Sequence, residues 1–288
     1  MESDFKIAVI GLGIIGGSIA YALKGFKDAY IVGCDKNPKT RQSALKRGAV
    51  KEVFENPAEA MENADLIILC TFPKSIPNIV RENTGAIKNG AVVTDICGVK
   101  TEISKAISDS LPRGVDYVGG HPMAGKEVGG FDNAEPDLFQ DTGFIIIPSE
   151  TTKRESVDLI YEMAKYMGAT RITMASPNEH DSVIAYTSDL MHVAASALCL
   201  DYPKEMNNAY TAGAFRDCTR VARIDPKLWT ELFMANGHHT VREIDRFIES
   251  LTKIRNAIAN RDEETLENLL DTVNKNKIIM LSKEPEEF

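Results

Sequence analysis

The feature that most constrains the fold is a glycine-rich turn near the start of the chain. The apolar run Lys6–Ile10 leads into Gly11, Gly13 and Gly16 in the pattern G-x-G-x-x-G, followed by small residues. The first glycine permits a tight turn, the second lets the backbone approach a pyrophosphate, and the third allows a helix to pack closely on a strand. The N-terminus of such a helix favours an anion. The sequence therefore predicts a β-α unit that binds a dinucleotide.

A second apolar run extends this dinucleotide site. Residues 30–33 lead to Asp35, which lies 19 residues after Gly16. A carboxylate in this place accepts hydrogen bonds from the ribose hydroxyls and repels a 2′-phosphate. We therefore expect NAD as the cofactor, and the nearby Lys36 and Arg41 leave the strictness of NAD over NADP open.

Apolar runs alternate with helix-like stretches over the first half of the chain. The runs are residues 6–10, 30–33, 65–70, 91–94, 115–118, 144–147 and 171–174. This alternation is typical of an α/β fold with a mainly parallel sheet. We expect a Rossmann-type, doubly wound dinucleotide-binding domain over residues 1–174.

The second half of the chain reads as helices. Ser176, Pro177 and Glu179 have the order of a capping box with proline at the first helical position, so a helix should start there. Periodic apolar stretches follow over residues 226–258 and 262–281. We expect an all-α substrate and dimerisation domain over residues 175–288, which forms a homodimer through its helices.

Composition narrows the class of protein. The chain has 288 residues, 43% of them hydrophobic, enough for two domains with sizeable cores. The net charge of -9 argues against nucleic acid or a membrane surface as the main partner. The start lacks a signal-peptide pattern, and we expect no run of membrane-spanning length, so a cytoplasmic protein is predicted. The five scattered cysteines suggest neither disulfides nor a metal site.

An acid-base group is expected where the strands end, because ligands bind beyond the carboxyl ends of a parallel sheet. Three loops qualify: residues 70–73, 95–100 and 119–125. The third contains His121, which titrates near neutral pH and is followed by a proline. From the residues alone, a structural and a catalytic histidine both remain open. The expected cofactor-binding residues are Gly11, Gly13, Ile14, Ile15, Gly16, Asp35, Cys70 and Thr71.

Four segments carry a resemblance to a known family. H-P-M-A-G from His121 resembles the signature loop of the prephenate/arogenate dehydrogenases. S-P-N-E-H-D from Ser176 resembles the family's S-P-x-x-H-D, and L-M-H ending at His192 resembles its L-P-H. F-R-D-C-T-R ending at Arg220, with a later D-P and Trp229, resembles its F-R-D-x-T-R…D-P-x-x-W segment. The resemblance covers residues 6 to about 236, in the family's order and spacing.

The resemblance implies an oxidative decarboxylation. Hydride leaves the ring carbon that bears the hydroxyl, the ring carboxylate departs as carbon dioxide, and the ring becomes aromatic. The expected reaction is the NAD-dependent conversion of prephenate, a small anionic molecule, to 4-hydroxyphenylpyruvate in tyrosine biosynthesis. Arogenate, which would give tyrosine, is the alternative substrate.

The resemblance also implies roles for two residues. His121 is expected to be the catalytic histidine that takes or polarises the hydroxyl proton. Arg220 is expected to bind the ring carboxylate through its planar guanidinium. If this segment is helical, Arg216, Arg220 and Arg223 form one basic stripe, and Asp217 is placed to orient Arg220.

Further polar residues are expected at the substrate. His192 is expected to contact the substrate side chain, and Lys126 to add positive charge where the substrate enters. His180 is expected to bind substrate, with a cap or interdomain contact as its alternative, because on one helix it lies roughly 18 Å from His192. His238 and His239, in the middle of a long expected helix, are interpreted as surface or interface residues.

Two departures from the family pattern leave questions open. Gly98 stands where the family commonly has a serine that assists the histidine, and Cys97 or a water could replace it. Asp189 replaces a histidine often found three residues before His192. These changes bear on the choice between prephenate and arogenate, which the sequence leaves undecided.

Two other functions are compatible with a dinucleotide-binding domain followed by helices. One is a dehydrogenase of 3-hydroxy acids or imines with a catalytic lysine, and the other is a non-catalytic module that binds NAD. Neither explains the H-P-M-A-G and F-R-D-x-T-R segments together. The chain ends soon after the last expected helix, so we expect no appended amino-acid-sensing domain, and any feedback by tyrosine would act at the active site.

Overall fold

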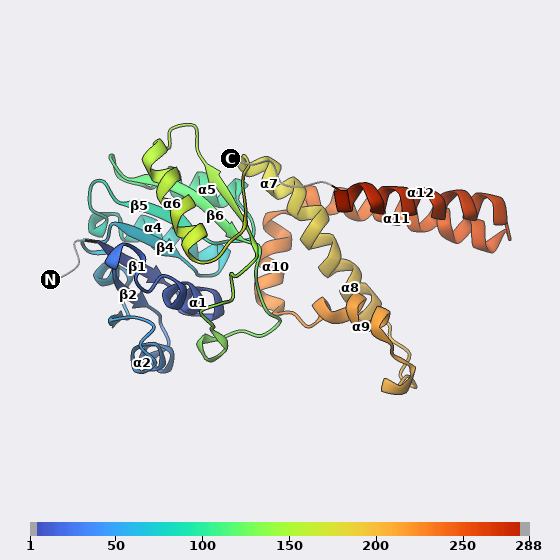
Figure 1. Ribbon diagram of the computed structural model, residues 1–288, viewed down its shortest axis with the longest axis horizontal. Coiled ribbons are helices and arrows are strands. Elements are labelled where there is room, and N and C mark those ends of the chain that lie inside the picture. The colour runs from blue at the N-terminus through green and yellow to red at the C-terminus, as the bar shows by residue number, and fades with distance from the viewer. Residues whose placement is uncertain (1–4, 283–288) are drawn as a thin grey trace.

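A single eight-stranded sheet organises the first part of the molecule (Figure 1). The computed structural model describes residues 5–282, so the expectation about the end of the chain lies outside the described residues. The strand order is β3-β2-β1-β4-β5-β6-β7-β8, and of these neighbours only β6 and β7 pair antiparallel. The strands are β1 (Lys6–Ile10), β2 (Tyr30–Cys34), β3 (Glu52–Phe54), β4 (Leu66–Leu69), β5 (Val92–Asp95), β6 (Asp116–Pro122), β7 (Gly143–Pro148) and β8 (Arg171–Met174). The mainly parallel α/β fold is confirmed.

Helices cover both faces of this sheet, as its residue pattern requires. In β1, Ile7 and Val9 belong to one apolar cluster, and Ala8 and Ile10 belong to the cluster on the opposite face. Both faces of a central parallel strand are therefore buried. The covering helices are α1 (Ile14–Ala22), α2 (Pro38–Lys46), α3 (Pro57–Met61), α4 (Ile76–Glu82), α5 (Thr101–Ser108) and α6 (Arg154–Tyr166).

The remaining chain is helical, as expected. Ser176 caps its first helix, and the reciprocal bonds between Ser176 and Glu179 complete the predicted capping box. The helices are α7 (Pro177–Ile184), α8 (Leu190–Leu200), α9 (Gly213–Thr219), α10 (Pro226–Ala235), α11 (Gly237–Ala259) and α12 (Glu263–Ser282). Figure 1 shows α10 beside the sheet, while α11 and α12 extend away from it as a long antiparallel pair.

Three predictions about elements were wrong. The short edge strand β3 was missed because its three residues lack a long apolar run. The long helix expected over residues 226–258 breaks at Asn236, whose buried amide donates to the carbonyl of Asp181 and the carboxylate of Asp189. His121 lies within β6 and not in a loop after it, because β7 pairs with β6 through to Pro122.

The helical run Pro177–Leu200 also corrects an expectation. A π-helical turn at Ala185–Asp189 joins α7 to α8 without a break. The joined run is long and apolar enough, by length and composition, to cross a membrane, so our statement that no run reaches that length was wrong. One such helix is weak evidence for a membrane, because a core helix of a globular protein meets the same criterion.

Candidate active site

The expected dinucleotide site lies where the strand order reverses, between β1 and β4. Gly11 has φ +96°, and a Cβ there would lie 2.5 Å from the carbonyl oxygen of Cys70. A Cβ at Gly16 would lie 1.9 Å from the carbonyl oxygen of Gly11, so helix α1 packs directly on the turn. Gly13 faces open space and caps α1 without a side chain, which leaves the N–H groups of Ile14 and Ile15 for an anion.

The end of β2 supplies the acidic side of this site. Asp35 accepts hydrogen bonds from the backbone N–H of Leu12 at 2.9 Å and of Asn37 at 2.8 Å, which fixes its carboxylate beside the glycine turn. Arg41 donates to the carbonyl of Asp35 and pairs with Glu55 at 2.7 Å. Because Arg41 is already paired, the surroundings of Asp35 fit ribose hydroxyls better than a 2′-phosphate.

Cys70 and Thr71 complete the edge next to the glycine turn. Cys70 donates its backbone N–H to the carbonyl of Ile10 at 2.7 Å, so the end of β4 is held against β1. Thr71 accepts a hydrogen bond from the Ser75 hydroxyl at 3.1 Å. The structure thus brings all eight expected cofactor residues to one edge of the sheet.

His121 reaches the same carboxyl edge from β6. Its backbone pairs with Ile145 of β7, so the ladder fixes the position of the side chain. Its Nδ1 atom lies 2.8 Å from Nε2 of His180, which comes from α7. His180 is 1% exposed, and its Nδ1 lies 2.8 Å from Oδ1 of Asp181. Both ring nitrogens of His180 are therefore used inside the protein, which favours the interdomain contact that was the alternative to a contact with substrate.

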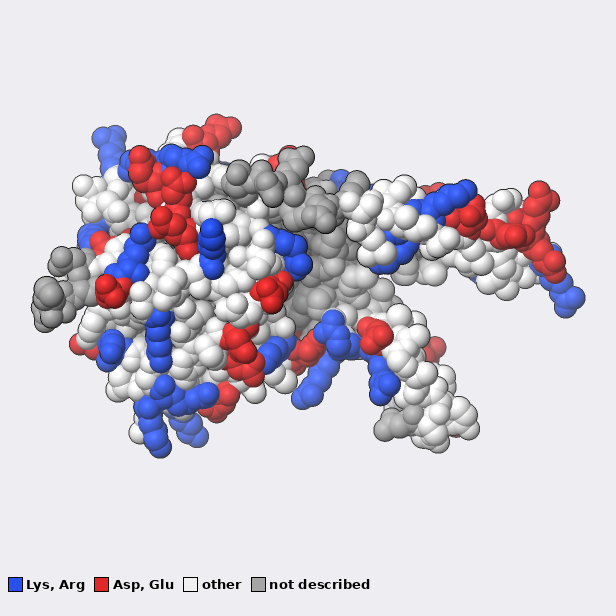
Figure 2. Space-filling view, viewed as in Figure 1, with Lys and Arg blue, Asp and Glu red and all other residues white. Residues whose placement is uncertain are grey.

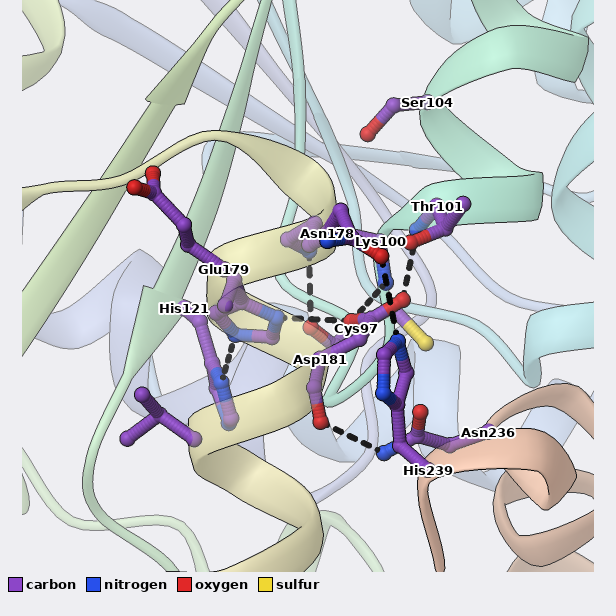
Figure 3. Close-up of polar contacts among 12 residues, drawn as sticks. Cys97, Lys100, Thr101, Ser104, His121, Asn178, Glu179, Asp181, Asn236 and His239 are labelled. Carbon is purple, nitrogen blue, oxygen red and sulfur yellow. Dashed lines mark hydrogen bonds and ion pairs between the residues drawn. The ribbon is translucent and has the colours of Figure 1, made fainter.

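Asp181 links this histidine pair to helix α5. Its Oδ1 accepts from the backbone N–H of Lys100 and its Oδ2 from that of Thr101, each at 2.8 Å. Figure 3 shows Asp181 between Thr101 and Asn236, with a dashed line to each. Burial alone would raise the pKa of Asp181, but the hydrogen bonds from His180 and Thr101 outweigh it and lower the pKa. Asp181 is therefore a carboxylate at neutral pH.

The two histidines are uncharged at neutral pH. Burial lowers the pKa of His121 well below the ordinary value, and the nearby His180 and Lys100 lower it further. Burial also lowers the pKa of His180, although the hydrogen bond to Asp181 partly opposes this shift. A neutral imidazole can accept a proton, so the pair suits a general base and its support.

The loop between β5 and α5 faces the ring of His121. A Cβ at Gly98 would lie 3.8 Å from Nε2 of His121 and 3.5 Å from Leu232 of α10, so the position of the missing serine is adjacent to the histidine. Burial raises the pKa of the neighbouring Cys97 to about 12, so it stays a thiol. The group that replaces the serine must therefore be one that contacts Nε2 or Nδ1 of His121.

A buried ion pair holds this loop, and the sequence reasoning missed it. Lys100 is fully buried, with Nζ 2.5 Å from Oδ1 of Asp95 and 2.7 Å from the carbonyl of Cys97. The hydroxyl of Tyr117 donates to Oδ2 of Asp95 at 2.5 Å. Both charges are paired with each other and hydrogen-bonded to neighbouring groups, as a buried pair requires. The sequence signal was a lysine in a strand-end loop, five residues after an aspartate.

The expected substrate-binding residues form a second, more exposed group. Arg220 pairs with Glu127, and their side chains are 65% and 34% exposed. His192 bonds the carbonyl of Ser188 through Nδ1 and stacks on Trp229, with ring centroids 3.6 Å apart. Burial lowers the pKa of His192, and Arg220 lowers it further, so these residues share one electrostatic environment.

Two details differ from the expected arginine arrangement. Helix α9 ends at Thr219, before Arg220, so Arg216, Arg220 and Arg223 do not form one helical stripe. The partner that orients Arg220 is Glu127, from a distant loop, and not Asp217.

Lys126 does not present a free charge where the substrate was expected to enter. It pairs with Glu135, whose backbone N–H donates to Ser18 of α1. His239 makes a contact between two helices, which fits its interpretation as a surface or interface residue. It lies in the first turn of α11, where its Nε2 is 3.2 Å from the side chain of Asn178.

Helix α10 connects the two groups. Trp229 stacks on His192, and Leu232, three residues later on the same face, lies next to Gly98. Between them, Glu231 accepts a hydrogen bond from the backbone of Lys74 in the sheet region, at 3.1 Å. Helix α10 thus contacts both the loop beside His121 and the group that contains His192 and Arg220.

Comparisons with known proteins agree with this arrangement. The family model "Prephenate dehydrogenase, nucleotide-binding domain" matches residues 19–173, and "Prephenate dehydrogenase, dimerization domain" matches residues 176–272. A cyclohexadienyl dehydrogenase of Zymomonas mobilis is 34% identical, with 90% of each chain covered. A prephenate dehydrogenase of Lactococcus lactis is 32% identical over 92% of this chain and 75% of its own.

Solved structures show the same likeness over the whole fold. Prephenate dehydrogenase from Aquifex aeolicus, in complex with hydroxyphenyl propionate and NAD+, has a TM-score of 0.86 at 27% identity, covering 96% of this chain and 98% of its own. Synechocystis arogenate dehydrogenase has a TM-score of 0.81 at 27% identity, covering 96% and 100%.

Proposed function

This chain belongs to the prephenate/arogenate dehydrogenase family, and from that premise we propose that it catalyses the oxidative decarboxylation of prephenate with His121 as its base. It is an NAD-dependent oxidoreductase with a nucleotide-binding domain and a dimerization domain. The observation that carries the proposal is the position of His121. It stands at the end of β6, on the same sheet edge as the dinucleotide turn, with a neutral ring.

The residues present fit the cofactor. The open side of Gly13 and the uncapped start of α1 suit a pyrophosphate, and Asp35 suits a ribose. When bound there, NAD supplies the hydride acceptor.

The chain's own residues act on the proton and the carboxylates. His121 takes the proton of the ring hydroxyl as the carbon that bears it is oxidised. Arg220 releases Glu127 and binds a carboxylate of the substrate in its place, through charge-assisted hydrogen bonds. Loss of carbon dioxide then leaves the electron pair that makes the ring aromatic, and 4-hydroxyphenylpyruvate is the product.

Arogenate is the alternative substrate, supported by the similarity to Synechocystis arogenate dehydrogenase. The alternative with a catalytic lysine is disfavoured. Lys100 is the lysine near His121, and its ammonium is held by Asp95 and the carbonyl of Cys97. Its side chain is also fully buried, so it does not present its charge to a substrate.

We also propose a homodimer formed through the C-terminal helices. Many apolar side chains along α11 and α12 are exposed in the single chain, among them Phe247, Ile248, Leu251, Ile258, Leu270, Val273, Ile278 and Ile279. Figure 2 shows uncharged surface between the charged side chains of this helix pair. A second copy would cover this surface. We further propose that the two domains divide between residues 174 and 175, which lie between β8 and α7. The proposed location of the protein is the cytoplasm.

The test is NADH formation by absorbance, with prephenate and arogenate offered in parallel to the purified protein. Turnover of prephenate that is lost in His121→Asn supports the proposal. Turnover of arogenate alone makes this an arogenate dehydrogenase. No turnover of either substrate refutes the proposal.

A further inference from the structure

We infer that His180 and Asp181 are positioning residues that hold His121 in the tautomer whose Nε2 atom carries no hydrogen. The inference rests on the proposed function only in taking His121 as the base. It assigns His180 a role that sequence reasoning did not give it, and it answers which group serves in place of the missing serine at Gly98.

The argument starts at helix α5, which fixes the direction of the first hydrogen bond. Asp181 accepts from the backbone N–H of Lys100 and of Thr101, and backbone N–H groups can only donate. The N-terminus of α5 also stabilises the negative charge. Asp181 is therefore a fixed acceptor, and Nδ1 of His180, 2.8 Å away, must donate to it.

The second hydrogen bond follows from the first. A neutral imidazole has one N–H group, and in His180 that group is on Nδ1. Nε2 of His180 therefore accepts, so Nδ1 of His121, 2.8 Å from it, must donate. The single N–H of a neutral His121 is then used, and its Nε2 retains the lone pair that takes a proton.

The other ring nitrogen faces a residue that has no side chain. Nε2 of His121 lies next to Gly98, where a Cβ would be 3.8 Å away. No side chain at position 98 can orient the ring from this side. The orientation comes from the opposite nitrogen, through His180 and Asp181, which are nearly inaccessible to solvent.

The tautomer decides whether the reaction can proceed. In the other tautomer Nε2 would present an N–H to the ring hydroxyl and could not accept its proton. Partners that orient a metal-bound histidine contribute about 10- to 100-fold in activity, and we expect an effect of this size for the partners of His121. The ionisable groups that interact with the pair are Asp181 from α7 and Lys100 and Asp95 from the β5–α5 segment.

A matched pair of variants separates positioning from packing. In His180→Gln, the longer amide reaches the place of the imidazole Nε2, and its oxygen can accept from His121. In His180→Asn, the shorter amide reaches Asp181 but not His121. We expect His180→Gln to keep kcat within about tenfold of wild type, and His180→Asn to lose about 10- to 100-fold with little change in KM. Equal kcat values in the two variants would overturn the inference.

The tautomer can also be observed without turnover. In wild-type protein labelled with ¹⁵N in its five histidines, the His121 signals are assigned by their loss in His121→Asn. We expect a protonated Nδ1 and an unprotonated Nε2 at neutral pH, and the reverse pattern refutes the inference. This spectrum decides the tautomer even if neither prephenate nor arogenate is oxidised, in which case only the proposed function fails. Because it is recorded on wild-type protein, it also decides the tautomer when His180→Asn does not fold.

Discussion

The two halves of the candidate site hold their functional side chains in opposite ways. His121 is fixed by the β6–β7 ladder and by a buried chain of hydrogen bonds that ends on α5. Arg220 lies just past the end of α9, mostly exposed, and is held by one carboxylate, Glu127. A group that moves a proton needs a fixed tautomer and low solvation, whereas a group that binds an anion needs to exchange partners. The difference between the two halves therefore matches the two tasks.

The largest effect is expected from His121→Asn, which removes the base but keeps a polar side chain of similar reach. We expect kcat to fall by about 10²- to 10⁴-fold, because general-base catalysis contributes that much. KM for prephenate should change little, since Arg220 is untouched. Steady-state NADH formation measures both constants. A large rise in KM with kcat retained would show that His121 binds substrate and does not take its proton.

Arg220→Lys tests the exposed half. The charge stays, but the planar fork that binds a carboxylate with two hydrogen bonds is lost. We expect kcat/KM for prephenate to fall by about 10- to 100-fold, mainly through KM, because a hydrogen bond to a charged group contributes about 1.5–3 kcal/mol. Arg216→Lys is the matched control on the adjacent helix. If both variants behave alike, Arg220 has no special role.

The sequence predicted the cofactor edge of the sheet better than the surroundings of His121. The glycine turn, Asp35 and the strand ends follow from local patterns, because each residue's task is set by its own strand and turn. The pairing of His121 with His180 joins residues 59 positions apart, and the bond from Lys100 to Asp181 joins residues 81 apart. No local pattern encodes such contacts. They depend on how α7 packs on α5.

The prediction of one helical arginine stripe was wrong for a different reason. The helical spacing of Arg216, Arg220 and Arg223 was read correctly as a pattern, but α9 ends before the second of them. A periodic pattern does not mark where a short helix stops. The sequence likewise does not show that Glu127 pairs with Arg220, because the loop after β6 contacts this segment only in the folded protein.

Salt should separate the two halves without any mutation. The charges around Arg220 are exposed, so raising ionic strength from about 0.05 M to about 0.5 M screens the attraction for an anionic substrate. The hydrogen bonds around His180 are buried and are screened much less. We expect KM to rise by a few-fold at constant kcat, measured with a salt of weakly binding ions. A parallel fall in kcat would mean that the buried half is also sensitive to salt.

The smallest effect concerns two buried aspartates on the same helical run. Asp181 has a lowered pKa, whereas burial raises the pKa of Asp189 because Asn236 and Thr240 offer it only an amide and a hydroxyl. A folded state with a raised carboxyl pKa binds more protons than the unfolded state, so this group's contribution to stability is lost as pH rises through the folded pKa.

Asp189→Asn removes that loss and keeps an oxygen that can accept both hydrogen bonds. The melting temperature of this variant relative to wild type should therefore increase as pH rises from about 4, near the ordinary carboxyl pKa, through the raised pKa of the folded state. Asp181→Asn should behave in the opposite sense. The stability that Asp181 contributes is present above its unfolded pKa and is lost as pH falls through its lowered folded pKa. If both variants shift the melting temperature in the same direction with pH, the contrast between the two carboxylates is wrong, and Asp181 is no better stabilised by α5 than Asp189 is by side chains.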